Sequence, residues 1–191
     1  IDYHFDQVAF GPEIHFSRQL SGEMESATVT GGIKMAMKII PELTEEGVGA
    51  KAYRLIPFNG NPLVPFVIFD EYFVSPQANF PMHPHGGFEG YQMLMEGSTE
   101  YNDNLGNKGL IGPGDVRRFV AGPGFNHSEY PRSKETVRGY LLWIKLPGAK
   151  LSTPSFFQEL HGDEVMRKED EGSIETTIFG GEFLFNNIGL N

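Results

Sequence analysis

Short apolar segments recur along the chain at nearly even spacing, and turn-forming residues separate them. The run 66–69 and the segment 137–146, which contains YLLWIKL, are apolar enough for buried strands. Alternation of apolar and polar residues predicts further strands at 33–40, 49–55 and 88–95. Short strands with even spacing are typical of a β-barrel or a β-sandwich, so we predict an all-β fold.

Turn residues indicate how some of these strands connect. The segments 98–103 and 108–111 flank the turn Asn-Leu-Gly-Asn, which predicts a β-hairpin. A Gly-Pro-Gly-Asp turn then leads into a strand at 116–121, and a Gly-Pro-Gly turn precedes a strand at 127–129. Residues 70–74 either continue the strand at 66–69 or turn away from it.

The two ends of the chain have weaker patterns than its middle. We expect an N-terminal extension at 1–32, with short strands at 8–10 and 27–30, and a barrel at 33–150. Residues 151–191 form a C-terminal extension, in which 156–166 is the best candidate for a helix and 174–179 for a late strand.

Composition agrees with this organisation. The 24 glycines, 13 prolines and 13% aromatic residues favour a turn-rich β domain over a helical one. A length of 191 residues suits one domain with extensions better than two full domains.

Charge, cysteine content and hydropathy exclude several classes of function. The net charge of -10 argues against direct binding of a nucleic-acid backbone, which depends on Lys and Arg. Without cysteine the chain has no disulfide, thiolate metal site or cysteine nucleophile. It also has no apolar run of about 18 residues and no charged-then-apolar leader, so we expect no membrane association and a cytoplasmic location.

The candidate chemistry lies in His83-Pro84-His85 and His127-Ser128-Glu129. In a strand, residues at i and i+2 point to the same face, so two neighbouring strands would direct three imidazoles and a carboxylate to one point. We expect His83 at the start of its strand, because the residue before a proline is extended and Pro84 donates no hydrogen bond. The isolated His4, His15 and His161 are expected to be ordinary surface or core residues.

A metal site with three nitrogens, one oxygen and no sulfur suits Fe(II), Mn(II), Ni(II), Cu(II) or Zn(II). Glu89 is a rival carboxylate, since its number places it on the same face of an extended chain as His83 and His85. It stands about 13 Å beyond His85 at about 3.3 Å per residue, so Glu129 is preferred and Glu89 is expected in a structural hydrogen bond or near the ligands.

Three segments resemble the N-terminal domain of the pirin family, which belongs to the cupin superfamily of small β-barrels. They are HPHGGFEGYQMLMEG, DNLGNKGLIGPGDVRRFVAGPGFNHSEYP and YLLWIKLP, within a match over roughly 50–180. The resemblance implies a cupin-type (jelly-roll) barrel with iron held by His83, His85, His127 and Glu129. Pirins typically carry two barrels, and the end of this chain resembles only the start of the second.

The chain departs from the family pattern beside the expected ligands. Gly86 stands where the pattern has Arg, Gly90 where it has Thr, and Pro123 where it has Arg or a similar polar residue. The loss of positive side chains removes electrostatic attraction for an anionic substrate and alters any surface that faces a partner.

Two functions follow from the resemblance. The first is a metal-dependent dioxygenase of quercetin-like flavonols or related aromatic enols, with O2 as the second substrate and Glu129 as general base. The second is a non-catalytic, iron-dependent regulatory protein of the transcriptional co-regulator type. An isomerase or lyase is a third possibility, since one fold hosts many reactions.

A homodimer is expected to cover open strand edges. Candidates to line an apolar pocket are Phe80, Met82, Phe125, Tyr91, Met93 and Met95, of which the last three are better explained as barrel core.

Overall fold

The computed structural model of the chain describes residues 3–5, 37–56, 63–169, 175–178, 182–183 and 186–187. It divides into two compact units, 41–164 and a second unit made of 1–40 and 165–191. The larger unit contains the candidate ligands. Within the part of the chain that is described, no helix has the length and apolar character needed to cross a membrane.

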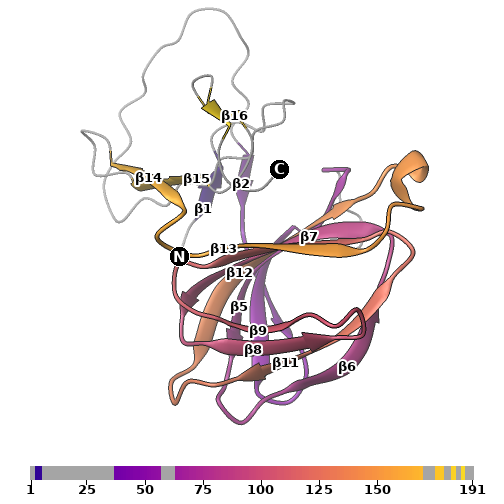
Figure 1. The fold of residues 1–191 in the computed structure, drawn as a ribbon. Helices are drawn as coiled ribbons and strands as arrows, with labels where there is room; N and C mark the ends of the chain where they lie inside the picture. The colour runs from indigo at the N-terminus through magenta and orange to yellow at the C-terminus, as the bar shows by residue number, and fades with distance from the viewer. Residues whose placement is uncertain are drawn as a thin grey trace, which may run out of the picture. The chain divides into compact units, whose positions relative to one another are not determined.

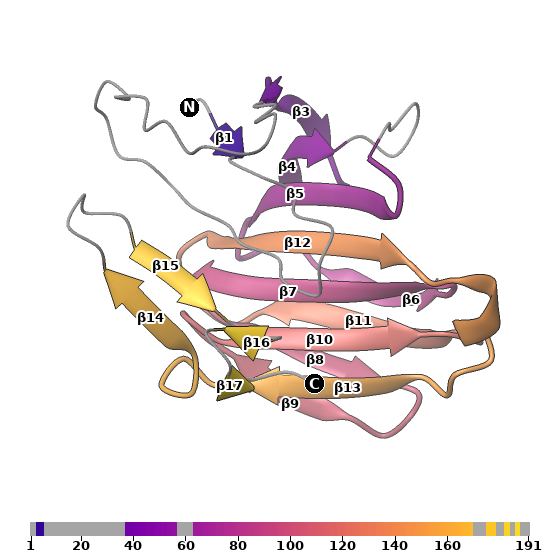
Figure 2. The ribbon, with the colours of Figure 1, turned by 90° about the horizontal axis from the view of Figure 1, so that it is seen from above.

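The larger unit consists of two antiparallel sheets that face each other (Figure 1). One sheet has seven strands in the order β13-β10-β7-β12-β5-β4-β3, and Figure 2 shows β5, β12, β7, β10 and β13 side by side. The other has four strands in the order β6-β11-β8-β9. The bounds are β3 Glu42–Glu45, β4 Ala50–Ile56, β5 Phe66–Val74, β6 Phe80–His85, β7 Phe88–Glu96, β8 Thr99–Asp103, β9 Lys108–Ile111, β10 Val116–Ala121, β11 Phe125–Pro131, β12 Val137–Lys145 and β13 Phe156–Leu160.

Side chains between the sheets form the core because successive residues of a strand point to opposite faces. One buried cluster is aliphatic with a single tyrosine, and a second is aromatic. The first contains Ala50, Val74, Ala78, Leu94, Tyr101, Ile111 and Val137. The second contains Phe119, Ala121 and Phe125, with Phe88, Trp143 and Phe157 packed against it.

Most of the predicted strands are confirmed. The hairpin predicted from 98–103 and 108–111 is formed by β8 and β9. The apolar segment predicted at 137–146 forms β12, which lies between β5 and β7. The strand that begins at Phe66 continues through Asp70 to Val74 rather than turning away.

The predicted helix at 156–166 is wrong. Residues Phe156–Leu160 form β13, which pairs with β10 from Val116↔Leu160 to Val120↔Phe156. The free edge of β10 supplies hydrogen-bond partners for an extended backbone, and this long-range pairing overrides a weak helical pattern. The compact unit therefore runs from 41 to 164, while the predicted division at 33–150 stays a prediction.

The position of His83 also differs from the expectation. β6 begins at Phe80, so His83 lies within the strand rather than at its start. Pro84 is tolerated there because β6 is at the edge of its sheet. The chain then turns at Gly86 and Gly87, where Gly87 has φ +81°, and β7 continues in the other sheet.

The second unit contains three two-stranded pairings. They are β1 Tyr3–Phe5 with β2 Met37–Ile39, β14 Met166–Glu169 with β15 Glu175–Ile178, and β16 Glu182–Phe183 with β17 Asn186–Asn187. β2 and β15 fall within the strands predicted at 33–40 and 174–179. The predicted strands at 8–10 and 27–30 lie outside the described residues.

Candidate metal centre

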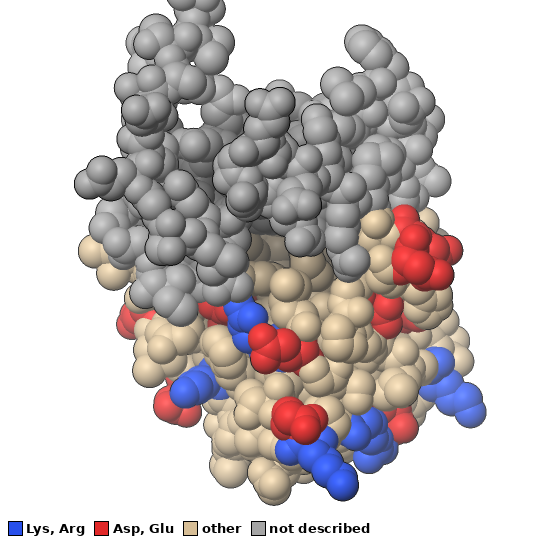
Figure 3. Space-filling view, turned by 90° about the vertical axis from the view of Figure 1, so that its left-hand side faces the viewer, with Lys and Arg blue, Asp and Glu red and all other residues tan. Residues whose placement is uncertain are grey.

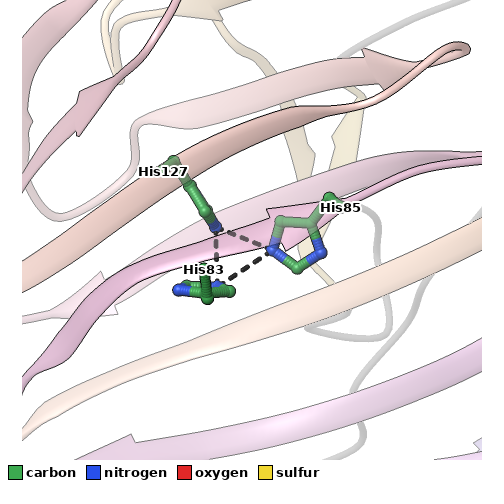
Figure 4. Close-up of side chains that lie close together, drawn as sticks. All are labelled: His83, His85 and His127. Carbon is green, nitrogen blue, oxygen red and sulfur yellow. Dashed lines mark hydrogen bonds between the residues drawn. The ribbon is translucent and has the colours of Figure 1, made fainter.

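Three imidazoles meet on the inner side of the four-stranded sheet (Figure 4). His83 and His85 come from β6 and His127 from β11, and the pairing of these strands places His127 directly opposite His83. The Nε2 atom of His85 is 3.0 Å from that of His83 and 2.8 Å from that of His127, and the third separation is 3.0 Å.

This triangle of nitrogens fits a shared cation better than a hydrogen-bonded cluster. Each neutral Nε2 is either a donor or an acceptor, so three of them cannot all satisfy one another. At a metal–nitrogen distance of about 2.1 Å, ligands at right angles are about 3.0 Å apart, whereas tetrahedral ligands are about 3.4 Å apart. The observed separations are short enough for His83, His85 and His127 to hold one ion together.

The protonation of the histidines favours ligation. Burial, and after it the neighbouring His127 and His83, lower the pKa of His85 to about 3. Burial and then the charge of Arg117 lower the pKa of His127, also to about 3. Nδ1 of His83 lies 2.8 Å from the carbonyl oxygen of Pro81, which fixes the tautomer that leaves the Nε2 lone pair free.

Aromatic rings hold His85 in place. The ring centroids of Phe88, Phe119, Phe125 and Trp143 lie 5.4, 5.8, 5.7 and 5.2 Å from that of His85. This apolar surrounding is the source of the burial that keeps the imidazole neutral.

Glu129, the predicted fourth ligand, is held differently from the histidines. It follows His127 by two residues on β11, but the pairing with β6 shifts register between them. Its Oε1 accepts a hydrogen bond from Nη2 of Arg117. The ligand atoms of the three histidines lie within 4.8 Å of one another, and Glu129 is outside this group. Its role as a ligand stays a prediction.

Arg117 lies beside the site and was not indicated by the sequence. The Arg117-Arg118 pair has no distinguishing pattern, and charged residues are rarely fully buried. In the structure Arg117 is 0% exposed and points inward, with its guanidinium carbon 4.3 Å from the ring centroid of Tyr101. The sequence of a strand does not show whether an arginine in it is buried or exposed.

The rival carboxylate Glu89 belongs to β7, in the opposite sheet from His83 and His85. It accepts hydrogen bonds from Nε of Arg118, at 2.6 Å, and from the hydroxyl of Tyr91. The prediction that Glu89 makes a structural hydrogen bond is confirmed.

The histidine triangle forms part of the wall of a cavity of about 390 Å³. Besides Phe80 and Glu129, the wall includes Tyr72 and Gln92, whose Nε2 donates to the Tyr72 hydroxyl at 3.2 Å. Burial, followed by the charge of Glu129, raises the pKa of Tyr72. Neither residue was singled out from the sequence, because a polar side chain in an alternating strand usually faces solvent.

The predicted lining residues are only partly correct. Phe80 borders the cavity and Phe125 belongs to the aromatic cluster, but Met82 is half exposed. The prediction that Tyr91, Met93 and Met95 face inward is wrong, because the buried positions of β7 are Gly90, Gln92 and Leu94. Both faces of β7 carry apolar residues, so alternation did not identify the inner face.

Of the three isolated histidines, only His161 has a described side chain. It is 64% exposed, with Nδ1 3.6 Å from a carboxylate oxygen of Asp115, and is a surface residue as predicted. His4 lies in β1, and His15 lies outside the described residues.

Comparison with known proteins identifies the family of this barrel. Residues 51–144 match the family model described as Pirin. Pirin-like protein 2 of Arabidopsis thaliana is 38% identical, over 76% of this chain and 45% of that protein. Human Pirin is 35% identical, over 79% of this chain and 52% of that protein.

A crystal structure of quercetin 2,3-dioxygenase from Acinetobacter baumannii is similar in fold. It has a TM-score of 0.68 and 27% sequence identity, over 79% of this chain and 52% of that one. The chain spans about half the length of the curated relatives it matches. The two facing sheets and these similarities confirm the expected all-β, cupin-type barrel, and the part of the chain that carries the three histidines belongs to the pirin family.

Proposed function

We propose that this protein is a metal-dependent dioxygenase of quercetin-like flavonols or related aromatic enols. The observation that carries the proposal is the triangle of imidazole Nε2 atoms in the wall of a largely apolar cavity of about 390 Å³. The similarity to a quercetin 2,3-dioxygenase structure supports this substrate class. A cavity of this size suits a small organic ligand.

His83, His85 and His127 would hold the ion, which we propose to be Fe(II), with Mn(II), Ni(II), Cu(II) and Zn(II) as alternatives. A bound divalent ion supplies Lewis acidity and a template that brings a hydroxyl group and O2 together. Glu129 lies in the same cavity wall.

The side chains around the triangle have distinct roles in this proposal. Phe80, Phe119 and Trp143 border the cavity and would pack against a planar aromatic ligand while excluding water. Glu129 would accept the hydroxyl proton of the ligand on Oε2, because Oε1 is bonded to Arg117.

The proposal is tested by oxygen consumption with quercetin. The Fe(II)-loaded protein is expected to consume O2 faster than a metal-free blank. His127→Ala should reduce the rate to that of the blank, whereas His161→Ala, at an exposed histidine, should not change it. A loaded protein that binds Fe(II) but consumes no O2 above the blank would contradict the dioxygenase function.

A metal-dependent interaction protein is the second candidate, favoured by the acidic charge of -10, which suits a basic protein partner. Where Figure 3 shows described residues, Lys and Arg side chains (blue) lie beside Asp and Glu side chains (red) and form no continuous basic surface. In this case Fe(II) would change partner affinity without O2 consumption. The homodimer, the absence of direct nucleic-acid binding and the cytoplasmic location stay predictions.

A further inference from the structure

A tyrosine and a glutamine lie on the inner face of the seven-stranded sheet, across the cavity from the histidine triangle. Tyr72 comes from β5 and Gln92 from β7, and β12 lies between these two strands. The two side chains meet over Gly139 of β12, where an added Cβ atom would lie 2.5 Å from the Tyr72 hydroxyl oxygen. The glycine therefore leaves the space in which Tyr72 reaches Gln92.

The hydrogen bond between these residues leaves one group of Tyr72 available. Gln92 is 4% exposed, and its Nε2 donates to the Tyr72 hydroxyl oxygen at 3.2 Å. A phenol hydroxyl can both accept and donate, so this bond uses its acceptor side and leaves its hydrogen. In the described part of the chain, the Tyr72 hydroxyl makes no second hydrogen bond. Burial raises the pKa of Tyr72, so the hydroxyl keeps this hydrogen at neutral pH.

The contribution of this pair to stability does not explain it. Oε1 of Gln92 is buried and has no hydrogen-bond partner among the described residues. An unpaired buried acceptor is unfavourable for folding. Tyr72 is only partly buried, and its side chain borders the cavity. A few polar groups in the wall of a largely apolar cavity are typical of a site that orients a ligand.

We propose that Tyr72 is a specificity-determining residue, whose hydroxyl donates a hydrogen bond to an acceptor oxygen of the bound ligand. Gln92 is then a positioning residue that orients this hydroxyl. The hydroxyl group of an aromatic enol would face the histidine triangle on one sheet, while a second oxygen of the ligand, such as a carbonyl oxygen, would accept from Tyr72 on the other. The inference rests on the proposed substrate class but not on the reaction with O2.

The test is the affinity of the Zn(II)-loaded protein for quercetin, measured without O2. Trp143 is the single tryptophan of the chain and borders the cavity, so quenching of its fluorescence reports binding there. Tyr72→Phe should raise the dissociation constant about three- to tenfold, because one hydrogen bond to the ligand is lost. Tyr53→Phe is the matched control and should leave the constant unchanged, since Tyr53 packs against Phe73 outside the cavity wall.

Gln92→Leu separates positioning from direct binding. It should raise the dissociation constant less than Tyr72→Phe does, and the double variant should bind no more weakly than Tyr72→Phe alone. Losses that multiply in the double variant would overturn the role of Gln92. If Tyr72→Phe binds quercetin as tightly as Tyr53→Phe, the role of Tyr72 is overturned and the substrate class stands. A wild type that does not bind quercetin would overturn both, whereas quercetin binding without O2 consumption would overturn only the proposed reaction.

Discussion

At the scale of single residues, Gly90 shows how a departure from the family pattern is compensated. Gly90 pairs with Phe119 across β7 and β10, and a Cβ atom at Gly90 would lie 2.2 Å from the Phe119 ring. The ring occupies the space that a side chain would need. The resemblance identified the missing threonine, but only the structure shows that Phe119 fills its place beside His85.

Gly90→Ala is therefore expected to lower the free energy of unfolding by about 1–3 kcal/mol, because the added methyl group overpacks the core. Urea denaturation measures this change. Gly86→Ala is the matched control, since its Cβ would meet only the Gly124 Cα at 3.7 Å, an ordinary contact. Equal losses in both variants would show that the Phe119 ring is not the cause.

At the scale of strands, β12 is held to both of its neighbours by Arg138. Its Nε donates to Oε1 of Glu71 on β5 at 2.7 Å, and its Nη1 donates to Oε1 of Glu96 on β7 at 2.8 Å. Burial lowers the pKa of Arg138, but the hydrogen bonds to Glu71 and Glu96 together outweigh it, so the pKa is raised. The carboxylate of Glu71 is 1% exposed, so this ion pair is shielded from solvent.

Arg138→Met should destabilise the barrel by about 3 kcal/mol, because it removes a guanidinium from a buried carboxylate. Thermal or urea unfolding gives the value, and Glu71→Gln in the same chain should recover part of the loss. Arg132→Met provides the comparison, since the Arg132–Glu100 pair is about half exposed and screened by solvent, and its loss should cost much less than the loss of Arg138. A similar cost for both substitutions would contradict the role of Arg138.

The strands also show the limit of pattern reasoning. Alternation located β4 and β7, and an apolar run located β12, because burial in a sheet requires apolar side chains on at least one face. It did not locate β13, whose strand depends on the edge of β10, and it did not decide the inner face of β7. Both depend on partners distant in the sequence.

At the scale of the whole molecule, the histidine triangle makes stability depend on pH. His85 and His127 have folded pKa values near 3, while an unfolded histidine has a pKa of about 6.5. Between these values the unfolded chain binds protons that the folded barrel does not. Stability from these two groups is therefore complete above about pH 6.5 and is lost as the pH falls toward 3.

The free energy of unfolding of the metal-free protein should fall by up to about 1.4 kcal/mol per pH unit for each of these histidines. Urea titrations between pH 7 and pH 4 measure this slope. His85→Asn with His127→Asn should reduce it, and His161→Asn should not. At pH 7, a divalent ion at 100 times its dissociation constant should add about 2.7 kcal/mol. A slope unchanged in the double variant would argue against buried, neutral imidazoles.

The sequence by itself determined the all-β fold, most strands of the barrel and the candidate histidines His83, His85 and His127. These features depend on local patterns, namely alternation, turn residues and the i, i+2 spacing of a strand. Only the tertiary structure showed that the three Nε2 atoms converge and that Arg117 is buried against Glu129. The physical reason is that strand register and burial are set by contacts between residues far apart in the sequence, which no local pattern contains.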